Sequence, residues 1–369
     1  MVSAKISSML LGMATTAMMV AIPGISAATV IGSLGNFDVI NDSGTTAHGF
    51  EIELEDLHSS DISDVFAGPG RPFHMGRGFD RNTAVVRYGA PTISEYTDAV
   101  NNKFGTRVTY MGLFSNGAWD FGTPFGSIIT PGDNCWTGGG VGYGPGTPCD
   151  HFGVGTRKNP TKTTYNWLLE TSASSDILTK GGVNLPAPNW QVIPNQANPA
   201  AAPQVIAQIE APEAEFKDQF GEALWVKVYT TAIENEVELE DLVGGNPVID
   251  NAETELEWRL LQTNPKKPDA GVLERGRDVA VGDNAKSIIR RYEFFKYTGE
   301  YDPEDHEALL LFPANDFPDV SELGIYLGAQ NAGVNLNVAP VPVPAAVWLL
   351  GSSLLGLVGI ARRRVTRTA

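Results

Sequence analysis

Alternation of apolar and polar residues is the feature that most constrains the fold of this chain. In "HGFEIELED", Phe50, Ile52 and Leu54 alternate with three glutamates, and "ALWVKVYT" repeats the pattern. Successive side chains of a β-strand point to opposite faces, so this period predicts strands with one buried side. Further candidates are "ELEWRLLQ" from Glu255 and "SIIRRYEFFKY" from Ser287. The sequence therefore predicts a mainly β protein.

Helical signals are few. The strongest lies in "PTISEYTDAVNNKFG", where Thr92 and Glu95 have the spacing of a capping box. Apolar residues recur near the helical period after them, and Gly105 follows as a terminator. This segment is the strongest helix candidate in the body of the chain, and a short turn around Glu213 to Phe220 is a second possibility.

A proline-rich stretch divides the predicted strands into two groups. Five prolines lie in "LPAPNWQVIPNQANPAAAP", residues 185–203. Proline removes a backbone donor and stiffens the chain, so we interpret this stretch as a linker. The 369-residue chain then holds two β-sandwich-like domains, at residues 29–184 and 204–337. The strand pattern of the second resembles immunoglobulin-like and fibronectin type III sandwiches.

The charge of the chain is strongly negative, at −17. Five of its 26 basic residues lie in the two terminal segments, so the body between them is more acidic still. An acidic surface repels phosphate backbones, which disfavours nucleic acid as a partner. Solubility is the interpretation that this charge favours.

The first 28 residues read as a signal peptide. Lys5 supplies a positive charge, an apolar run follows, and small residues end at Ala28. Cleavage there would make Thr29 the first mature residue. The alternative is an uncleaved anchor helix, which Pro23 disfavours because it breaks the apolar run before the small residues.

Cys135 and Cys149 are the two cysteines of the chain, on either side of a glycine-rich loop. In an exported protein such a pair predicts one disulfide. In the chain-entropy model, a disulfide that closes a loop of this length raises the free energy of unfolding by about 3 kcal/mol. A metal site with His151 is the alternative, which we disfavour because two cysteines without CxxC spacing are poor zinc ligands.

The C-terminal segment has the pattern of a single transmembrane helix. Residues 345–361 contain no charged residue, and Arg362, Arg363 and Arg364 follow them. A helix of this length spans about 25 Å, at the short end of what crosses a hydrocarbon core. The arginines mark the cytoplasmic side, which places the acidic body outside.

Residues 338–369 as a whole combine three elements in order. A proline motif precedes the apolar run and the arginines, and it consists of Val341, Pro342, Val343, Pro344 and Ala345. This tripartite order resembles a PEP-CTERM sorting signal of the VPxPA type. Members more often have Glu where this chain has Val343.

The resemblance implies specific partners and a destination. Exosortase, a membrane-embedded cysteine transpeptidase, would process the chain near the proline motif after the secretion machinery has exported it. Insertion in the inner membrane would be transient, and the body would reach the cell envelope, the outer surface or the extracellular matrix. The alternative is a permanent single-span anchor with a proline-rich stalk.

The sequence contains few signals of a catalytic or metal site. The chain has no G-x-S-x-G, H-E-x-x-H or Walker motif, and no residue is identified as catalytic. In "DPEDHE", Asp302, Glu304 and Asp305 offer oxygen ligands for calcium, the one cofactor that the sequence suggests. The spacing of an EF-hand loop is missing, so we favour a solvated acidic turn.

Four tryptophans keep a binding function open. Trp119, Trp136, Trp167 and Trp190 lie in glycine- or proline-rich neighbourhoods, where exposed rings can stack on sugars. Core packing explains them equally well, and we favour it. The leading hypothesis is an exported structural or interaction protein without catalysis. The alternative is a secreted carbohydrate-binding or carbohydrate-active protein, with exopolysaccharide as partner.

Overall fold

The strands predicted from alternation are present in the computed structural model of the chain. It describes residues 31–66, 88, 91–129, 152–172, 174–183, 185–193, 204–242, 254–267, 272–273, 285–312 and 317–336. Within these ranges lie nineteen strands and two short 3-10 helices, η1 (Ser59–Asp61) and η2 (Leu239–Leu242). The prediction of a mainly β protein is confirmed.

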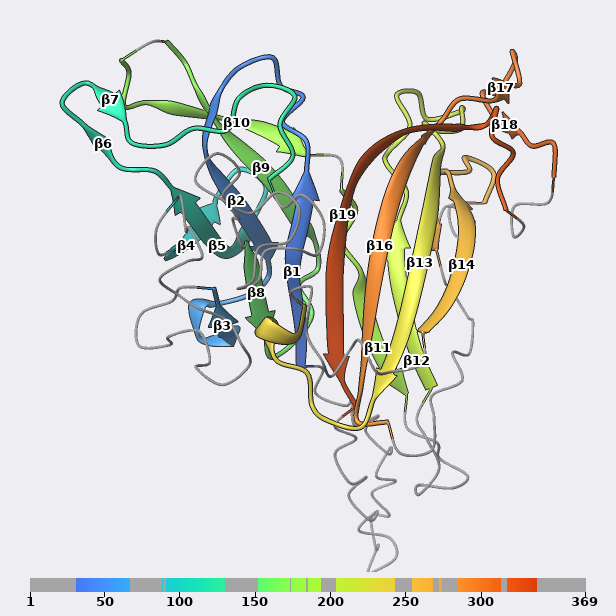
Figure 1. The fold of residues 1–369 in the computed structure, drawn as a ribbon, viewed down its shortest axis with the longest axis horizontal. Coiled ribbons are helices and arrows are strands. Elements are labelled where there is room, and N and C mark those ends of the chain that lie inside the picture. The colour runs from blue at the N-terminus through green and yellow to red at the C-terminus, as the bar shows by residue number, and fades with distance from the viewer. Residues whose placement is uncertain are drawn as a thin grey trace, which may run out of the picture. The chain divides into compact units, whose positions relative to one another are not determined.

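A seven-stranded antiparallel sheet is the largest element of the fold (Figure 1). In spatial order it contains β14 (Thr254–Leu261), β13 (Leu224–Ile233), β16 (Ser287–Tyr297), β19 (Leu323–Asn335), β1 (Ile31–Val39), β8 (Gly153–Thr156) and β3 (Ile62–Val65). Strand β19 is central, because it pairs with β16 on one side and with β1 on the other.

Four smaller sheets complete the described fold. The five-stranded sheet has the order β10 (Leu178–Val183), β9 (Thr163–Glu170), β2 (Ala47–Glu55), β5 (Lys103–Met111) and β4 (Thr92–Asp98). The three-stranded sheet has the order β11 (Asn189–Ile193), β12 (Gln204–Glu210) and β15 (Val272–Leu273). The two-stranded sheets pair β6 (Phe114–Ser115) with β7 (Ala118–Trp119), and β17 (Glu300–Tyr301) with β18 (Ala308–Leu309).

The alternation in β2 is the clearest case of sequence periodicity becoming structure. Phe50, Ile52 and Leu54 are all fully buried. On the opposite face, the Glu53 carboxylate accepts hydrogen bonds from Arg107 Nε and Lys180 Nζ, each at 2.9 Å. One face of the strand therefore builds the core and the other carries cross-strand ion pairs.

An aromatic cluster joins the five-stranded sheet to the long sheet. The ring of Phe50 stacks on Phe152 with centroids 4.6 Å apart, and it meets the edge of Trp167 at 5.4 Å. Phe37 of β1 lies 5.6 Å from Phe50 and 4.8 Å from Tyr165 of β9. These contacts place the two sheets face to face around one core, as in a β-sandwich.

The strands of the two predicted domains share one sheet, which corrects the predicted division. Strand β1, from residues 29–184, pairs with β19, from residues 204–337, between Ile31↔Asn335 and Val39↔Gly328. Residues 28–339 accordingly form one compact unit. The alternation pattern shows which residues are buried in a strand but carries no information on which strand lies beside it.

The predicted linker at residues 185–203 is partly a strand. Residues 189–193 form β11, which pairs antiparallel with β12, and Trp190 and Val192 are buried. β11 itself contains no proline: Pro188 precedes the strand and Pro194 follows it. Prolines bound the strand here, a position in which their missing donor breaks no ladder.

The predicted helix at residues 92–105 is wrong, because this segment forms the β4–β5 hairpin. Thr92, Ile93 and Tyr96 are residues that favour strands. Asn102 has a positive φ of 52°, as a tight turn requires. A Cβ at Gly105 would lie 2.4 Å from Leu54 O, so this glycine permits close strand pairing and ends no helix.

Truncating Phe50 tests the shared core. We expect Phe50→Ala to lower the free energy of unfolding by about 3–5 kcal/mol, because it leaves a cavity among packed rings. Phe125 is 63% exposed, so Phe125→Ala is the matched control. This substitution should change the free energy of unfolding by less than about 0.5 kcal/mol. Urea unfolding measures both, and equal effects of the two substitutions would contradict the packing described.

Candidate functional site

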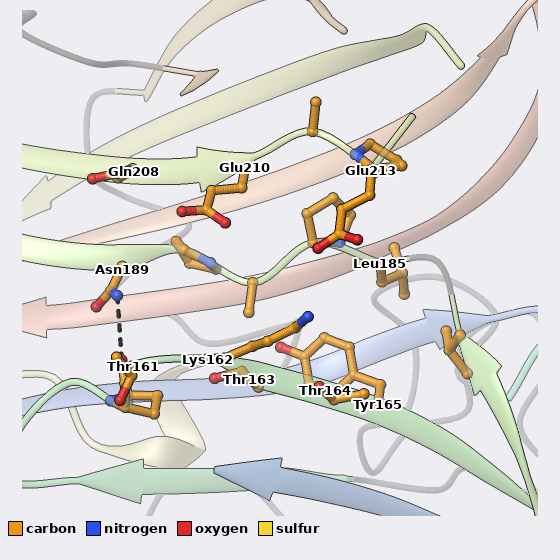
Figure 2. Close-up of a pocket in the computed structure, with 17 residues that line it drawn as sticks. Thr161, Lys162, Thr163, Thr164, Tyr165, Leu185, Asn189, Gln208, Glu210 and Glu213 are labelled. Atoms are coloured by element: carbon orange, nitrogen blue, oxygen red, sulfur yellow. Dashed lines mark hydrogen bonds between the residues drawn. The ribbon is translucent and has the colours of Figure 1, made fainter. Parts of the chain in front are cut away.

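A cleft of about 240 Å³ lies beside the five-stranded and three-stranded sheets (Figure 2). We call it the β9–β12 cleft, and its lining consists of residues 160–165, Val183, residues 185–189, Gln208 and residues 210–213. Residues 160–165 lead into β9, and Val183 is the last residue of β10. Residues 185–189 lead into β11, and Gln208 and residues 210–213 lie at the end of β12. Threonines and amides alternate with prolines and small apolar residues along it.

Opposite charges occupy opposite sides of the cleft. Figure 2 shows Glu210 and Glu213 on one side of residues 185–189 and Lys162 on the other. All three side chains are exposed, and none forms an ion pair or a side-chain hydrogen bond within the described part of the chain. The cleft thus presents two free carboxylates and one free ammonium group to a ligand.

A buried amide holds two of the cleft's segments together. Gln330 of β19 is fully buried, and its Oε1 accepts a hydrogen bond of 2.8 Å from the Tyr165 hydroxyl. Its Nε2 donates to the carbonyl oxygen of Pro186. Burial raises the pKa of Tyr165 well above its usual value, so this hydroxyl stays protonated and remains a donor.

Two further side chains fix the remaining backbone of the cleft. Asn189 Nδ2 donates to Pro160 O at 3.2 Å, and Thr263 Oγ1 donates to Pro212 O at 2.5 Å. Each bond satisfies a carbonyl that sits beside a rigid proline ring. The backbone of the cleft is therefore set before any ligand arrives, which reduces the ordering that binding requires.

The calcium candidates lie in a hydrogen-bonded turn. Asp302 Oδ1 accepts the backbone N–H of Glu304 at 2.7 Å and that of Asp305 at 3.3 Å. Asp305 Oδ2 pairs with Lys266 Nζ at 2.8 Å. In the described ranges, no group of three or more His, Cys, Asp or Glu side chains has the arrangement of a metal site. These contacts are those of a solvated acidic turn.

The other predicted site residues lie outside the described residues. These are the signal-cleavage pair Ala28 and Thr29, the cysteines Cys135 and Cys149, the motif Val341–Ala345, the apolar residues 345–361 and the arginines Arg362, Arg363 and Arg364. The disulfide, the signal peptide and the sorting signal therefore stay predictions. No helix that the structure describes is long and apolar enough to cross a membrane.

Two of the four tryptophans are core residues, as favoured from the sequence. Trp167 is fully buried and Trp190 is 3% exposed. Trp119 is partly exposed, stacks on the His48 ring at 5.0 Å and donates to Ser175 O at 3.0 Å. Trp136 lies outside the described residues. Neither buried ring can stack on a sugar.

Sequence reasoning missed the residues of the cleft. No motif marks Lys162, Glu210 or Glu213, and Gln330 is 165 residues from its partner Tyr165. A weak signal existed in the prolines of the lining, of which Pro186 and Pro188 belong to the stretch interpreted above as a linker. No protein-family model, curated protein or solved structure matches this chain.

Removing the buried amide tests its role in holding the cleft. We expect Gln330→Leu to lower the free energy of unfolding by about 1–3 kcal/mol, because the Tyr165 hydroxyl and the Pro186 carbonyl lose their partner. Adding Tyr165→Phe removes one of the unsatisfied groups, so the double variant should lose less than the sum of the single losses. Strict additivity in urea unfolding would contradict the described coupling.

The Lys266–Asp305 pair makes a pH-dependent prediction. The hydrogen bond from Lys266 lowers the pKa of Asp305 below its usual value. The pair therefore stabilises the fold above the unfolded-state pKa, and this contribution is lost as the pH falls through the lower folded-state pKa. In Lys266→Met, NMR titration should show the Asp305 midpoint moved upward. An unchanged midpoint would contradict the pairing.

Proposed function

We propose that this chain is an exported, non-catalytic component of the bacterial cell envelope or extracellular matrix. An N-terminal signal peptide directs it to the secretion machinery, and an exosortase-type enzyme then processes its C-terminal sorting signal. The mature protein is the β-rich body, which serves a structural or interaction role at the outer surface. Nucleic acid is not a partner of this acidic body.

One observation carries the proposal, which is the order of three elements in the last 32 residues. The motif Val341–Ala345 precedes the apolar residues 345–361, and Arg362–Arg364 follow. Prolines keep the chain before the membrane extended and free of internal hydrogen bonds, a form that can enter a processing cleft.

The carbohydrate-active alternative has less support. Its binding surface depended on loop aromatics, and Trp167 and Trp190 are buried. An extracellular interaction role needs no such surface, because a rigid β body with paired surface charges can serve it. The proposal includes a resemblance of residues 204–337 to immunoglobulin-like or fibronectin type III domains. This resemblance rests on the strand pattern.

The mass of the protein recovered from outside the cell tests the proposal. We expect a chain that begins at Thr29 and ends near residues 341–345, with Cys135 and Cys149 joined, when the host carries an exosortase-type enzyme. Changing Arg362–Arg364 to glutamine should abolish processing, whereas the matched lysine variant should keep it because the charge is retained.

Two results would contradict the proposal in different ways. A full-length C-terminus retained in the inner membrane would support the permanent anchor. An intact chain dissolved in the cytoplasm with reduced thiols would exclude export altogether.

A further inference from the structure

We infer that the β9–β12 cleft binds a small zwitterion of the amino-acid class. Its ammonium group would lie against Glu210 and Glu213, and its carboxylate against Lys162 and Thr163. This ligand does not depend on where the chain is delivered, because the cleft belongs to the folded body.

Separation of charge across the cleft selects a ligand with both signs. Glu210 and Glu213 share one side of the cleft, and Lys162 stands on the other without pairing to either of them. A simple cation would satisfy the carboxylates and leave the ammonium group of Lys162 unused. A zwitterion forms charge-assisted hydrogen bonds with both sides at once.

Thr163 strengthens the side of the cleft that would hold the carboxylate. It belongs to the cleft lining, follows Lys162 directly in the chain and lies opposite Leu54 in the β2–β9 register, whereas Thr164 lies opposite Glu53 on the other face of β9. The Thr163 hydroxyl can donate to an oxygen of a carboxylate, beside the charge of Lys162. Asn189 Nδ2 has two N–H groups, and one of them donates to Pro160 O.

The size and the apolar part of the cleft fit a single amino acid or a dipeptide. The volume of about 240 Å³ is smaller than the usual pocket of a drug-sized ligand. Val183, Leu185 and Ala187 contribute apolar surface to the same lining. An apolar side chain of the ligand would lie there, away from the charged groups.

Neutral sugars fit the same cleft less well. A sugar site pairs hydrogen-bonding groups with the flat face of an aromatic ring. Tyr165 is the aromatic residue of the lining, and it is 1% exposed with its hydroxyl bound to Gln330. The cleft therefore offers hydrogen bonds and charge but no exposed ring for stacking.

Calorimetric titration of the full chain in detergent micelles tests the inference. The probes are the free amino acids, and for leucine also N-acetylleucine, leucinamide and glucose. We expect at least one free amino acid with an apolar side chain to bind. Acetylation removes the cation and amidation removes the anion, so each derivative should bind about tenfold more weakly or worse.

Matched variants locate the binding. Glu210→Gln and Lys162→Met should each weaken binding of the free amino acid about tenfold. Glu215→Gln and Lys217→Met are the controls, because both residues are exposed and lie outside the lining. Thermal unfolding of each variant confirms that the exposed substitutions leave the fold intact.

Four results would overturn the inference. They are binding of glucose without binding of any amino acid, equal binding of leucine and leucinamide, equal effects of the cleft variants and their controls, and no binding of any probe at millimolar concentration. Each of these leaves the proposed export untouched, since the mass of the secreted chain tests that separately.

Discussion

Antiparallel pairing between β1 and β19 is the constraint on which the rest of the structure depends. It joins a strand near the N-terminus to one near the end of the body, from Ile31↔Asn335 to Val39↔Gly328. On the other side of β1, a glycine of β8 allows η2 to approach the sheet closely, since a Cβ at Gly153 would lie 2.5 Å from the Phe66 ring and 2.9 Å from Leu239. The close approach of backbone and side chain leaves no room for a larger residue.

The same central strand also organises the cleft. Gln330 lies within β19, and its amide binds the Tyr165 hydroxyl of β9 and the Pro186 carbonyl before β11. A fully buried amide of this kind stabilises the fold only when both of its ends are bonded. Strand β19 thus fixes the segments that lead into β9 and β11 relative to each other, and both segments line the cleft.

Sequence periodicity predicted the strands that have one buried and one solvated face. The segments around Phe50, Val226 and Glu255, and the segment from Ser287, are all strands. Strands β1 and β8 were missed because their glycines and small residues show no alternation. The β4–β5 hairpin was predicted to be a helix because capping-box spacing is a local signal. The pairing of β5 with β2 joins residues that lie far apart in the sequence, so no local pattern indicates it. The cleft escaped prediction because its residues meet only through long-range contacts.

Hydrogen exchange of the full chain, followed by mass spectrometry across a urea series, tests the central claim most directly. If one sheet spans both halves, peptides that cover residues 31–39 and 323–335 lose their protection at the same urea concentration. Loss of protection in one of these strands while the other remains protected would show two independent domains and would contradict this account.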